Sequence, residues 1–112
     1  YVYFIYGSHH CMNVVAHVPG VAGAVLLRGA EPVIGLGEDA RTLAGPGRLG
    51  RAFGLTVANT GMDLVRSPLH LREGAAVASR KVERSNRIGI SDSTTSAKPW
   101  RFAISGSGGV TR

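Results

Sequence analysis

The first fifteen residues, YVYFIYGSHHCMNVV (1–15), decide the fold, because they place strand-forming side chains on either side of a turn. Residues 1–6 are all aromatic or β-branched, and such side chains favour β-strands. Successive side chains of a strand point to opposite faces, so Tyr1, Tyr3 and Ile5 would share one face. Gly7-Ser8 is a turn signal, and residues 9–18 continue as a second extended stretch. We therefore expect a β-hairpin whose first strand is buried on both faces.

Residues 22–28, AGAVLLR, follow a Pro-Gly turn and predict a third strand, which completes a three-stranded antiparallel meander. Short strand pieces are also expected around the Glu73-Gly74 turn (69–71 and 76–78) and, as a buried fragment, over 88–90. Residues 91–99 form a polar stretch that predicts a loop, and WRFAIS (100–105) predicts the last strand. The fold class expected from these elements is α+β, mostly antiparallel sheet with a few short helices.

The main helix is expected within RLGRAFGL (48–55), where Leu49, Ala52 and Phe53 have the spacing of one helical face. Pro46 stands where the first turn of that helix tolerates proline. A further helical turn is expected over residues 38–43.

The composition limits the class of protein. The 112 residues suit one small domain, and 44% hydrophobic residues exclude a disordered basic tail. A single cysteine excludes an intramolecular disulfide and favours a reducing, cytoplasmic setting. No run approaches the roughly 20 apolar residues of a membrane span. The chain begins inside a strand-like segment without Met, so we expect residue 1 to be a truncation point within a partial domain, 1–112.

The charge points to a possible class of partner. The formal net charge is +6, from 13 basic and 7 acidic residues, and 11 of the basic residues are Arg, none before Arg28. The planar guanidinium group binds phosphates and base edges in a bidentate manner, so nucleic acid is a natural partner. An arginine-rich, solvated surface without such a partner explains the composition equally well.

Residues 45–50, GPGRLG, match the pattern G-x-G-x-x-G. A dinucleotide-binding loop needs a preceding strand within a βαβ unit, and the residues before Gly45 are helical and polar in pattern. The sequence therefore argues against a dinucleotide. Amide groups at a helix start, with Arg48 beside them, could hold a phosphate, and a plain helix start is an equal alternative.

Metal binding and self-contained catalysis are not expected. His9, His10, Cys11 and His17 lack the spacing of a zinc site, and a half-buried sheet face explains them. The carboxylates are scattered singly among basic residues, and Ser8 lacks the surroundings of a nucleophile elbow. No cofactor is implied. The dense aromatics of residues 1–6 suit either a stacking platform for bases or a plain core strand.

Five blocks of this sequence resemble the alkyladenine (3-methyladenine, or methylpurine) DNA glycosylase family, in the family's order. They are YVYFIYGSHHCMNVV, AVLLRGAEP, GPGRLGRAFGL, RIGI and KPWRF, and they match the C-terminal part of a family member. The resemblance implies an α+β fold with a hairpin that intercalates into DNA. It also implies base excision repair, in which a damaged purine is flipped out of the duplex and water hydrolyses its N-glycosidic bond.

The resemblance also implies roles for single residues. Tyr6, at the hairpin tip, would be the wedge that intercalates into DNA, and Tyr3 would stack on the flipped base. Asn13 would sit in the substrate pocket and discriminate against purines that bear the exocyclic amine of guanine. Arg28 would hold the attacking water.

Three further positions complete the implied site. The carbonyl group of Ile88, in RIGI, would be a further acceptor for the water. Gly47 and Arg48 would contact the DNA backbone. The expected partner is double-stranded DNA with a damaged purine, bound by a monomer without metal or membrane.

The sequence departs from the family pattern in several places. The family's general-base glutamate and two pocket aromatics lie upstream of the hairpin and are not in this chain, so we expect these 112 residues alone to be inactive. Ser8 replaces a larger apolar residue, and the segment 32–45 is short. The alternatives are a noncatalytic nucleic-acid-binding module with the same fold and an arginine-rich structural domain.

Overall fold

The computed structural model describes residues 1–37 and 39–111, except for the side chain of residue 40. The chain forms two compact units, each described by itself. Unit 1 comprises Tyr1–Arg72 and Gly108–Arg112, and unit 2 comprises Glu73–Ser107. Among the described residues, antiparallel sheets, one α-helix and short 3-10 turns confirm the α+β class. That residues 1–112 make up one partial domain stays a prediction.

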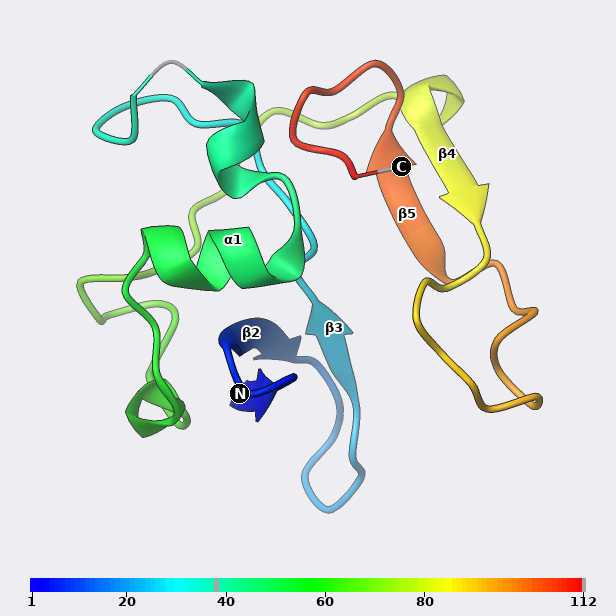
Figure 1. Cartoon of the computed structure of the whole chain (residues 1–112), viewed down its shortest axis with the longest axis horizontal. Helices are drawn as coiled ribbons and strands as arrows, with labels where there is room; N and C mark the ends of the chain where they lie inside the picture. The colour runs from blue at the N-terminus through cyan, green and yellow to red at the C-terminus, as the bar shows by residue number, and fades with distance from the viewer. Residues whose placement is uncertain (38, 112) are drawn as a thin grey trace. The chain divides into compact units, whose positions relative to one another are not determined.

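Unit 1 contains the expected meander. Strands β1 (Val2–Ile5), β2 (His9–Val15) and β3 (Ala24–Leu26) lie in the order β1-β2-β3, and both pairs are antiparallel (Figure 1). The register pairs Ile5 with His9, so a three-residue loop joins β1 to β2. Alternating side chains and turn residues, which are local signals, were therefore sufficient to predict these three strands.

The prediction that the first strand is buried on both faces is wrong. Exposure rises along one face of β1, from 5% at Val2 to 52% at Phe4, because the hairpin extends beyond the core toward its tip. The outer edge of β1 is covered near its start. The Thr60 hydroxyl accepts a hydrogen bond from the Val2 N–H (3.0 Å) and donates one to the Val2 carbonyl (3.2 Å). This contact gives hydrogen-bond partners to backbone groups that would have none at a free strand edge.

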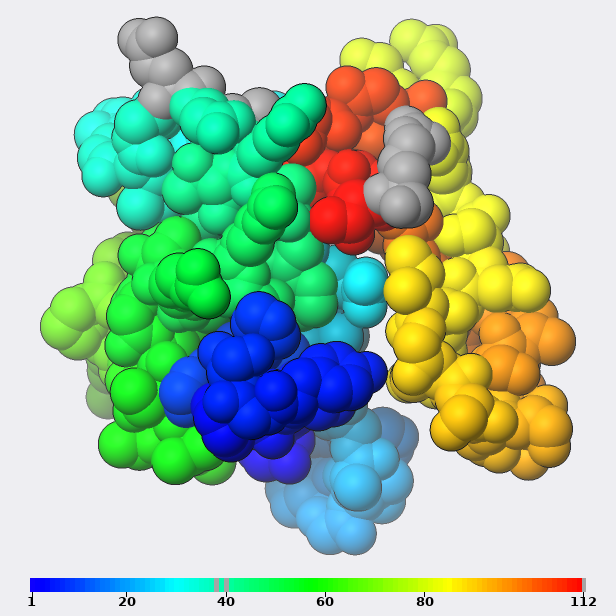
Figure 2. All heavy atoms as spheres, in the orientation of Figure 1, coloured from blue at the N-terminus to red at the C-terminus, as the bar shows by residue number. Residues whose placement is uncertain are grey.

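Helix α1 (Pro46–Ala52) begins at the expected proline and packs over β2 (Figure 1 and Figure 2). Its buried residues are Leu49 and Gly50, whereas Phe53 is exposed, so the predicted apolar face is correct only in part. The reason is that the helix ends at Ala52. Phe53 follows the helix as its C-cap, and its N–H donates a hydrogen bond to the Leu49 carbonyl. A Cβ on Gly50 would collide with the carbonyl oxygen of His10.

The remaining parts of unit 1 pack around a small core. The expected turn over 38–43 is a 3-10 helix, η1 (Ala40–Leu43), and Glu38 lies outside the described residues. A second turn, η2 (Val57–Asn59), is capped by Thr56. The core cluster is formed by side chains from β1, β2, α1 and the residue that follows the helix: Val2, Met12, Leu49 and Leu55.

The C-terminal segment of unit 1 lies against residues 29–30. A Cβ on Gly29 would collide with the carbonyl oxygen of Gly109, and a Cβ on Gly109 would collide with the Ala30 carbonyl group. Because both positions are glycine, the two backbones approach each other closely. This approach brings the chain back to unit 1 after unit 2.

Unit 2 is built on an antiparallel pair, β4 (Val82–Ser85) and β5 (Arg101–Ile104), preceded by η3 (Ser79–Lys81). Strand β5 was expected. Strand β4 was not, because VERS lacks the apolar alternation of a half-buried strand. The guanidinium carbon of Arg84 lies 5.1 Å from the ring centre of its cross-strand partner Phe102. This cation–π contact stabilises a pair that exposes its aromatic ring.

The three strand pieces predicted over 69–71, 76–78 and 88–90 are wrong. Within the described structure, neither residues 69–78 nor residues 88–90 form a strand. Ile88 is exposed, and Gly89 has a φ of 73°, which interrupts an extended backbone. Short apolar runs become strands only when a neighbouring strand supplies hydrogen bonds. The predicted polar loop over 91–99 is confirmed.

Candidate nucleic-acid interface

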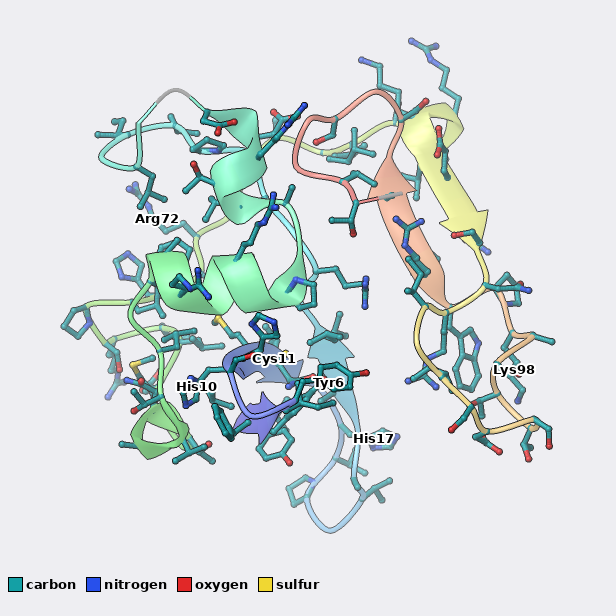
Figure 3. The ribbon with its side chains drawn as sticks, in the orientation of Figure 1. Tyr6, His10, Cys11, His17, Arg72 and Lys98 are labelled. Atoms are coloured by element: carbon teal, nitrogen blue, oxygen red, sulfur yellow. The ribbon has the colours of Figure 1, made fainter. Side chains whose placement is uncertain are left out.

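The hairpin tip presents one aromatic side chain. Tyr6 has a φ of 57° and is the one non-glycine residue with positive φ in the described part of the chain. Gly7 follows with a φ of 67°, and the N–H of Ser8 donates to the Ile5 carbonyl at 3.3 Å. Tyr6 is 79% exposed at the end of the hairpin (Figure 3). A left-handed conformation is unfavourable for a bulky residue, and such strain is frequent at functional positions.

Behind the tip, Tyr3 belongs to a partly buried cluster. Tyr3 is the cross-strand partner of Cys11, which is buried on β2 beside helix α1 (Figure 3). Burial raises the pKa of the Tyr3 hydroxyl above 10.0, and the hydrogen-bonded Cys11 thiol raises it further. The Arg28 guanidinium acts on this pKa in the opposite direction. Tyr3 and Cys11 are therefore neighbours across the β1–β2 pair, and the charge of Arg28 acts on the Tyr3 hydroxyl.

The backbone of Arg28 is tied to the start of helix α1. The Arg28 carbonyl accepts a hydrogen bond from the N–H of Gly45 at 2.9 Å, and Ala30 donates to the Leu43 carbonyl at 3.3 Å. The structure thus connects the AVLLRGAEP and GPGRLG segments, which are far apart in the sequence.

Asn13 is a buried polar residue on β2, with 7% of its surface exposed. Its Nδ2 donates to the carbonyl groups of Tyr1 (3.2 Å) and Cys11 (3.4 Å). Its backbone also exchanges two hydrogen bonds with Tyr1. The side-chain amide therefore holds the start of β1 against β2, a role the sequence did not predict. Discrimination between purines by Asn13 stays a prediction.

The two predicted DNA-backbone residues differ in their surroundings. Gly47 is half-buried, because its Cα lies against the imidazole ring of His9, where a Cβ would come within 2.6 Å of Nδ1. Arg48 is exposed, and its Nη1 donates to the carbonyl of Arg41 at 3.3 Å. The exposed side chains of Arg41, Arg48 and Arg51 give η1 and α1 a basic surface.

His9 is the neighbour of this surface that sequence reasoning missed. Its Nδ1 is buried and has no hydrogen-bond partner among the described residues. No spacing rule relates residue 9 to residue 47, so only the fold reveals the contact. Ile88, the last predicted site residue, belongs to unit 2, and its carbonyl's part in the site stays a prediction.

Besides His9, which lies against Gly47, the other histidines and the cysteine of residues 9–17 also have contacts of their own. Cys11 pairs with Tyr3, the ring of His10 lies 4.8 Å from that of Phe4, and His17 accepts a hydrogen bond from the Val18 N–H. In residues 1–37 and 39–111, no group of three or more His, Cys, Asp or Glu side chains could hold a metal ion. Within the same residues, no helix is long and apolar enough to cross a membrane.

Comparison with known proteins gives one consistent family. The family model described as methylpurine-DNA glycosylase (MPG) matches residues 1–108. A protein of Myxococcus xanthus, named "Putative 3-methyladenine DNA glycosylase", is 48% identical over 105 residues, which cover 93% of this chain and 54% of that protein. Proteins of the same name from Anaeromyxobacter dehalogenans and Chlorobium phaeobacteroides are 42% and 40% identical, with 100% and 96% of this chain and 52% and 57% of theirs covered.

The chain spans about half the length of the curated relatives it matches. The match nevertheless includes the hairpin, the Arg28 segment and helix α1. On this evidence, the chain belongs to the methylpurine-DNA glycosylase family.

Proposed function

We propose that this chain carries the DNA-binding hairpin and part of the base pocket of a DNA glycosylase. The enzyme would flip alkylated or deaminated purines, 3-methyladenine among them, out of duplex DNA and hydrolyse their N-glycosidic bonds. The proposal draws on membership of the family. The observation that carries it is the exposed Tyr6 at the tip of a projecting hairpin.

Tyr6 has the properties that a wedge needs. Extrusion of a nucleotide costs a few kcal/mol of stacking and pairing, and an inserted side chain offsets part of that cost by filling the gap. The ring of Tyr6 is held in solvent by the turn, so it is available before DNA binds. A flat aromatic ring stacks on any neighbouring base, which suits a wedge that must act regardless of sequence.

The extruded base would enter a pocket at Tyr3 and Asn13. Tyr3 is half-buried, which leaves part of its ring available for stacking. Arg28 and the Ile88 carbonyl would position the water. The water oxygen would then bond to C1′ of the deoxyribose, the bond from C1′ to the base would break with its electron pair on the base, and a general base would take the water proton. From the family resemblance, we propose that this general base is a glutamate supplied by a segment outside these 112 residues.

The basic surface of η1 and α1 would grip the DNA backbone. Exposed arginines release counterions from DNA when they neutralise phosphates, so this grip would weaken with salt. Arg48 and the backbone near Gly47 are the contacts we expect, with Arg41 beside them. We further propose a monomer that works in the cytoplasm.

The test compares two forms of the protein. One is the 112-residue chain, and the other is the chain joined at its N-terminus to the segment that the Myxococcus xanthus relative carries outside the matched region. Release of 3-methyladenine from methylated DNA and of hypoxanthine from a duplex is measured for both. We expect release only from the longer form, with a loss of about tenfold or more in Tyr6→Ala and a smaller loss in Tyr6→Phe. Equal rates for these two variants and the parent would disprove the wedge.

The same experiment separates the alternatives. Salt-sensitive DNA binding without base release by either form would favour a noncatalytic nucleic-acid-binding module. The absence of both DNA binding and base release would favour an arginine-rich structural domain.

A further inference from the structure

The loop that joins β4 to β5 carries the carbonyl group of Ile88, for which we propose a part in holding the water (Figure 1). Among the described residues, no group donates a hydrogen bond to this carbonyl oxygen. Ile88 is exposed, and the next residue, Gly89, has a φ of 73°. The carbonyl oxygen is therefore available to a water molecule, and other parts of the loop must fix its direction.

The peptide group between Ile88 and Gly89 can turn over at low cost. Such a turn reverses the direction of the Ile88 carbonyl and changes the φ of Gly89. Glycine adopts positive and negative φ about equally well, so its backbone does not select one of the two directions. An acceptor that must hold a water within about 0.5 Å of a productive position needs a restraint. Side chains that flank the peptide are the natural source of that restraint.

Three side chains close the loop around this peptide. Arg87 donates from its Nη1 to the Thr95 hydroxyl at 3.0 Å, and the Thr95 hydroxyl donates to Oδ2 of Asp92 at 2.9 Å. We call this chain of two hydrogen bonds the Thr95 bridge. Residues 88–91 lie between its outer members in the sequence, so the bridge restrains this segment at both ends.

Thr95 is the central member of the bridge. Its hydroxyl accepts from a cation and donates to an anion, and hydrogen bonds with charged groups are about twice as strong as neutral ones. The carboxylate of Asp92 is itself held, because its other oxygen accepts from the Thr94 N–H at 3.0 Å. Thr95 is half-buried, whereas Arg87 and Asp92 are exposed. Removal of the Thr95 hydroxyl would therefore break both hydrogen bonds of the bridge at once.

We propose that Thr95 is a positioning residue, which fixes the direction of the Ile88 carbonyl through the Thr95 bridge. This inference rests on the proposed function and adds residues that the resemblance did not name. Without the Thr95 hydroxyl, the peptide after Ile88 would adopt both directions. Only part of the molecules would then present the acceptor to the water, which lowers the rate of hydrolysis and leaves the contacts with the DNA backbone unchanged.

The first test observes the peptide in the 112-residue chain by NMR. Isoleucine labelled with ¹³C at its carbonyl and glycine labelled with ¹⁵N give a correlation signal only for Ile-Gly pairs, and the sequence has two, at 34–35 and 88–89. In Thr95→Val we expect the 88–89 signal to shift or broaden and the 34–35 signal to stay in place. An unmoved 88–89 signal would overturn the inference.

Ser93→Ala is the matched control for this change. It also removes a hydroxyl group from the loop, and the Ser93 side chain makes no hydrogen bond with any other described residue. Both Ile-Gly signals should stay in place in this variant. Because Ser93 and Thr95 lie in the same turn, circular dichroism should show the same folded state for both variants.

The second test measures hydrolysis in the longer form of the protein. Release of hypoxanthine from a duplex is followed in a single turnover at saturating enzyme, and affinity for an undamaged duplex is measured separately. We expect Thr95→Val to lower the rate constant by about threefold to tenfold, because the water is less well placed. Affinity should stay within about twofold, as expected when only a transition-state interaction is lost. Thr95→Ser keeps the hydroxyl group and should restore the rate, and Ser93→Ala should match the parent.

The outcomes separate this inference from the function on which it rests. Equal rates for Thr95→Val and the parent, with a loss in Tyr6→Ala, would overturn the inference and leave the proposed function standing. Equal losses in Thr95→Ser and Thr95→Val, or a fall in affinity as large as the fall in rate, would make Thr95 a merely structural residue and would also overturn it. If the longer parent form releases no base, the proposed function fails and this inference fails with it.

Discussion

The carbonyl oxygen of His10 on β2 lies so close to the Cα of Gly50 on helix α1 that a Cβ at position 50 has no room. In an exposed helix, replacement of glycine by alanine stabilises by about 1 kcal/mol. Here we expect Gly50→Ala to destabilise unit 1 by about 1–3 kcal/mol, because helix and strand must separate. Urea unfolding measures the change. The control is Arg51→Ala, on the exposed side of the same helix, which should change stability by less than about 0.5 kcal/mol.

Thr60 provides a second test of how β1 is held. Its hydroxyl makes two hydrogen bonds with the backbone of Val2, so Thr60→Val should leave both backbone groups without this partner. We expect a loss of about 1–3 kcal/mol in the free energy of unfolding. Thr60→Ser keeps the hydroxyl group and should retain most of the stability. If the valine variant unfolds like the serine variant, the edge of β1 does not depend on this contact.

The surroundings of Tyr3 predict a dependence on alkaline pH. Burial and the Cys11 thiol raise the Tyr3 pKa above 10.0 in the folded chain. As pH rises, the Tyr3 hydroxyl therefore loses its proton at a higher pH in the folded state than in the unfolded state. Its contribution to the free energy of unfolding is present below pH 10 and is lost as pH rises through the raised pKa. NMR of ¹³Cζ-labelled tyrosine, assigned with Tyr3→Phe, should give a midpoint above 10.0. Arg28→Met should move it higher, and Cys11→Ala should move it lower.

Asp92 predicts the opposite dependence, in the loop of unit 2. Its carboxylate accepts hydrogen bonds from the Thr94 N–H (3.0 Å) and the Thr95 hydroxyl (2.9 Å), and these lower its pKa below 3.8. The hydrogen bonds should persist above pH 3.8 and be lost as pH falls through the lowered pKa. The chemical shift of the Thr94 amide against pH measures this midpoint. In Asp92→Asn the acidic transition should disappear, and a midpoint at or above 3.8 in the parent would contradict the geometry.

Arg48 tests the proposed contact with the DNA backbone. Removal of one phosphate contact reduces the slope of log K against log salt by about 1, whatever the DNA sequence. We expect this change for Arg48→Ala in fluorescence anisotropy with a duplex. Arg66→Ala is the control, because Arg66 is an exposed arginine of the same unit outside η1 and α1. Equal slopes for the two variants would argue against a specific role for the α1 surface.

Much of the fold could be predicted because its signals are local. Aromatic and β-branched residues around a Gly-Ser turn predicted β1 and β2, and Pro46 predicted the start of α1. Strand β4 was missed and residues 88–90 were overpredicted for one shared reason. Whether a short segment becomes a strand depends on a partner strand elsewhere in the chain, which local pattern does not contain.

The candidate site was predictable in its residues but not in its arrangement. The resemblance named Tyr3, Tyr6, Asn13 and Arg28, and it said nothing of Cys11, the buried cross-strand partner of Tyr3. The contact between His9 and Gly47 joins two segments that are distant in sequence. Such contacts depend on how β2 and α1 pack, so they follow only from the three-dimensional fold.

The close approach of Gly29 and Gly109 has a consequence for how length can vary in this chain. The polypeptide leaves unit 1 after Arg72 and returns to it at Gly108. Unit 2 is therefore an insertion between two segments that both belong to unit 1. The entropy of closing such a loop grows slowly, by about 0.6 kcal/mol for each doubling of its length. Residues 73–107 could therefore be lengthened or shortened by engineering at little thermodynamic expense to unit 1, as long as both glycines are kept.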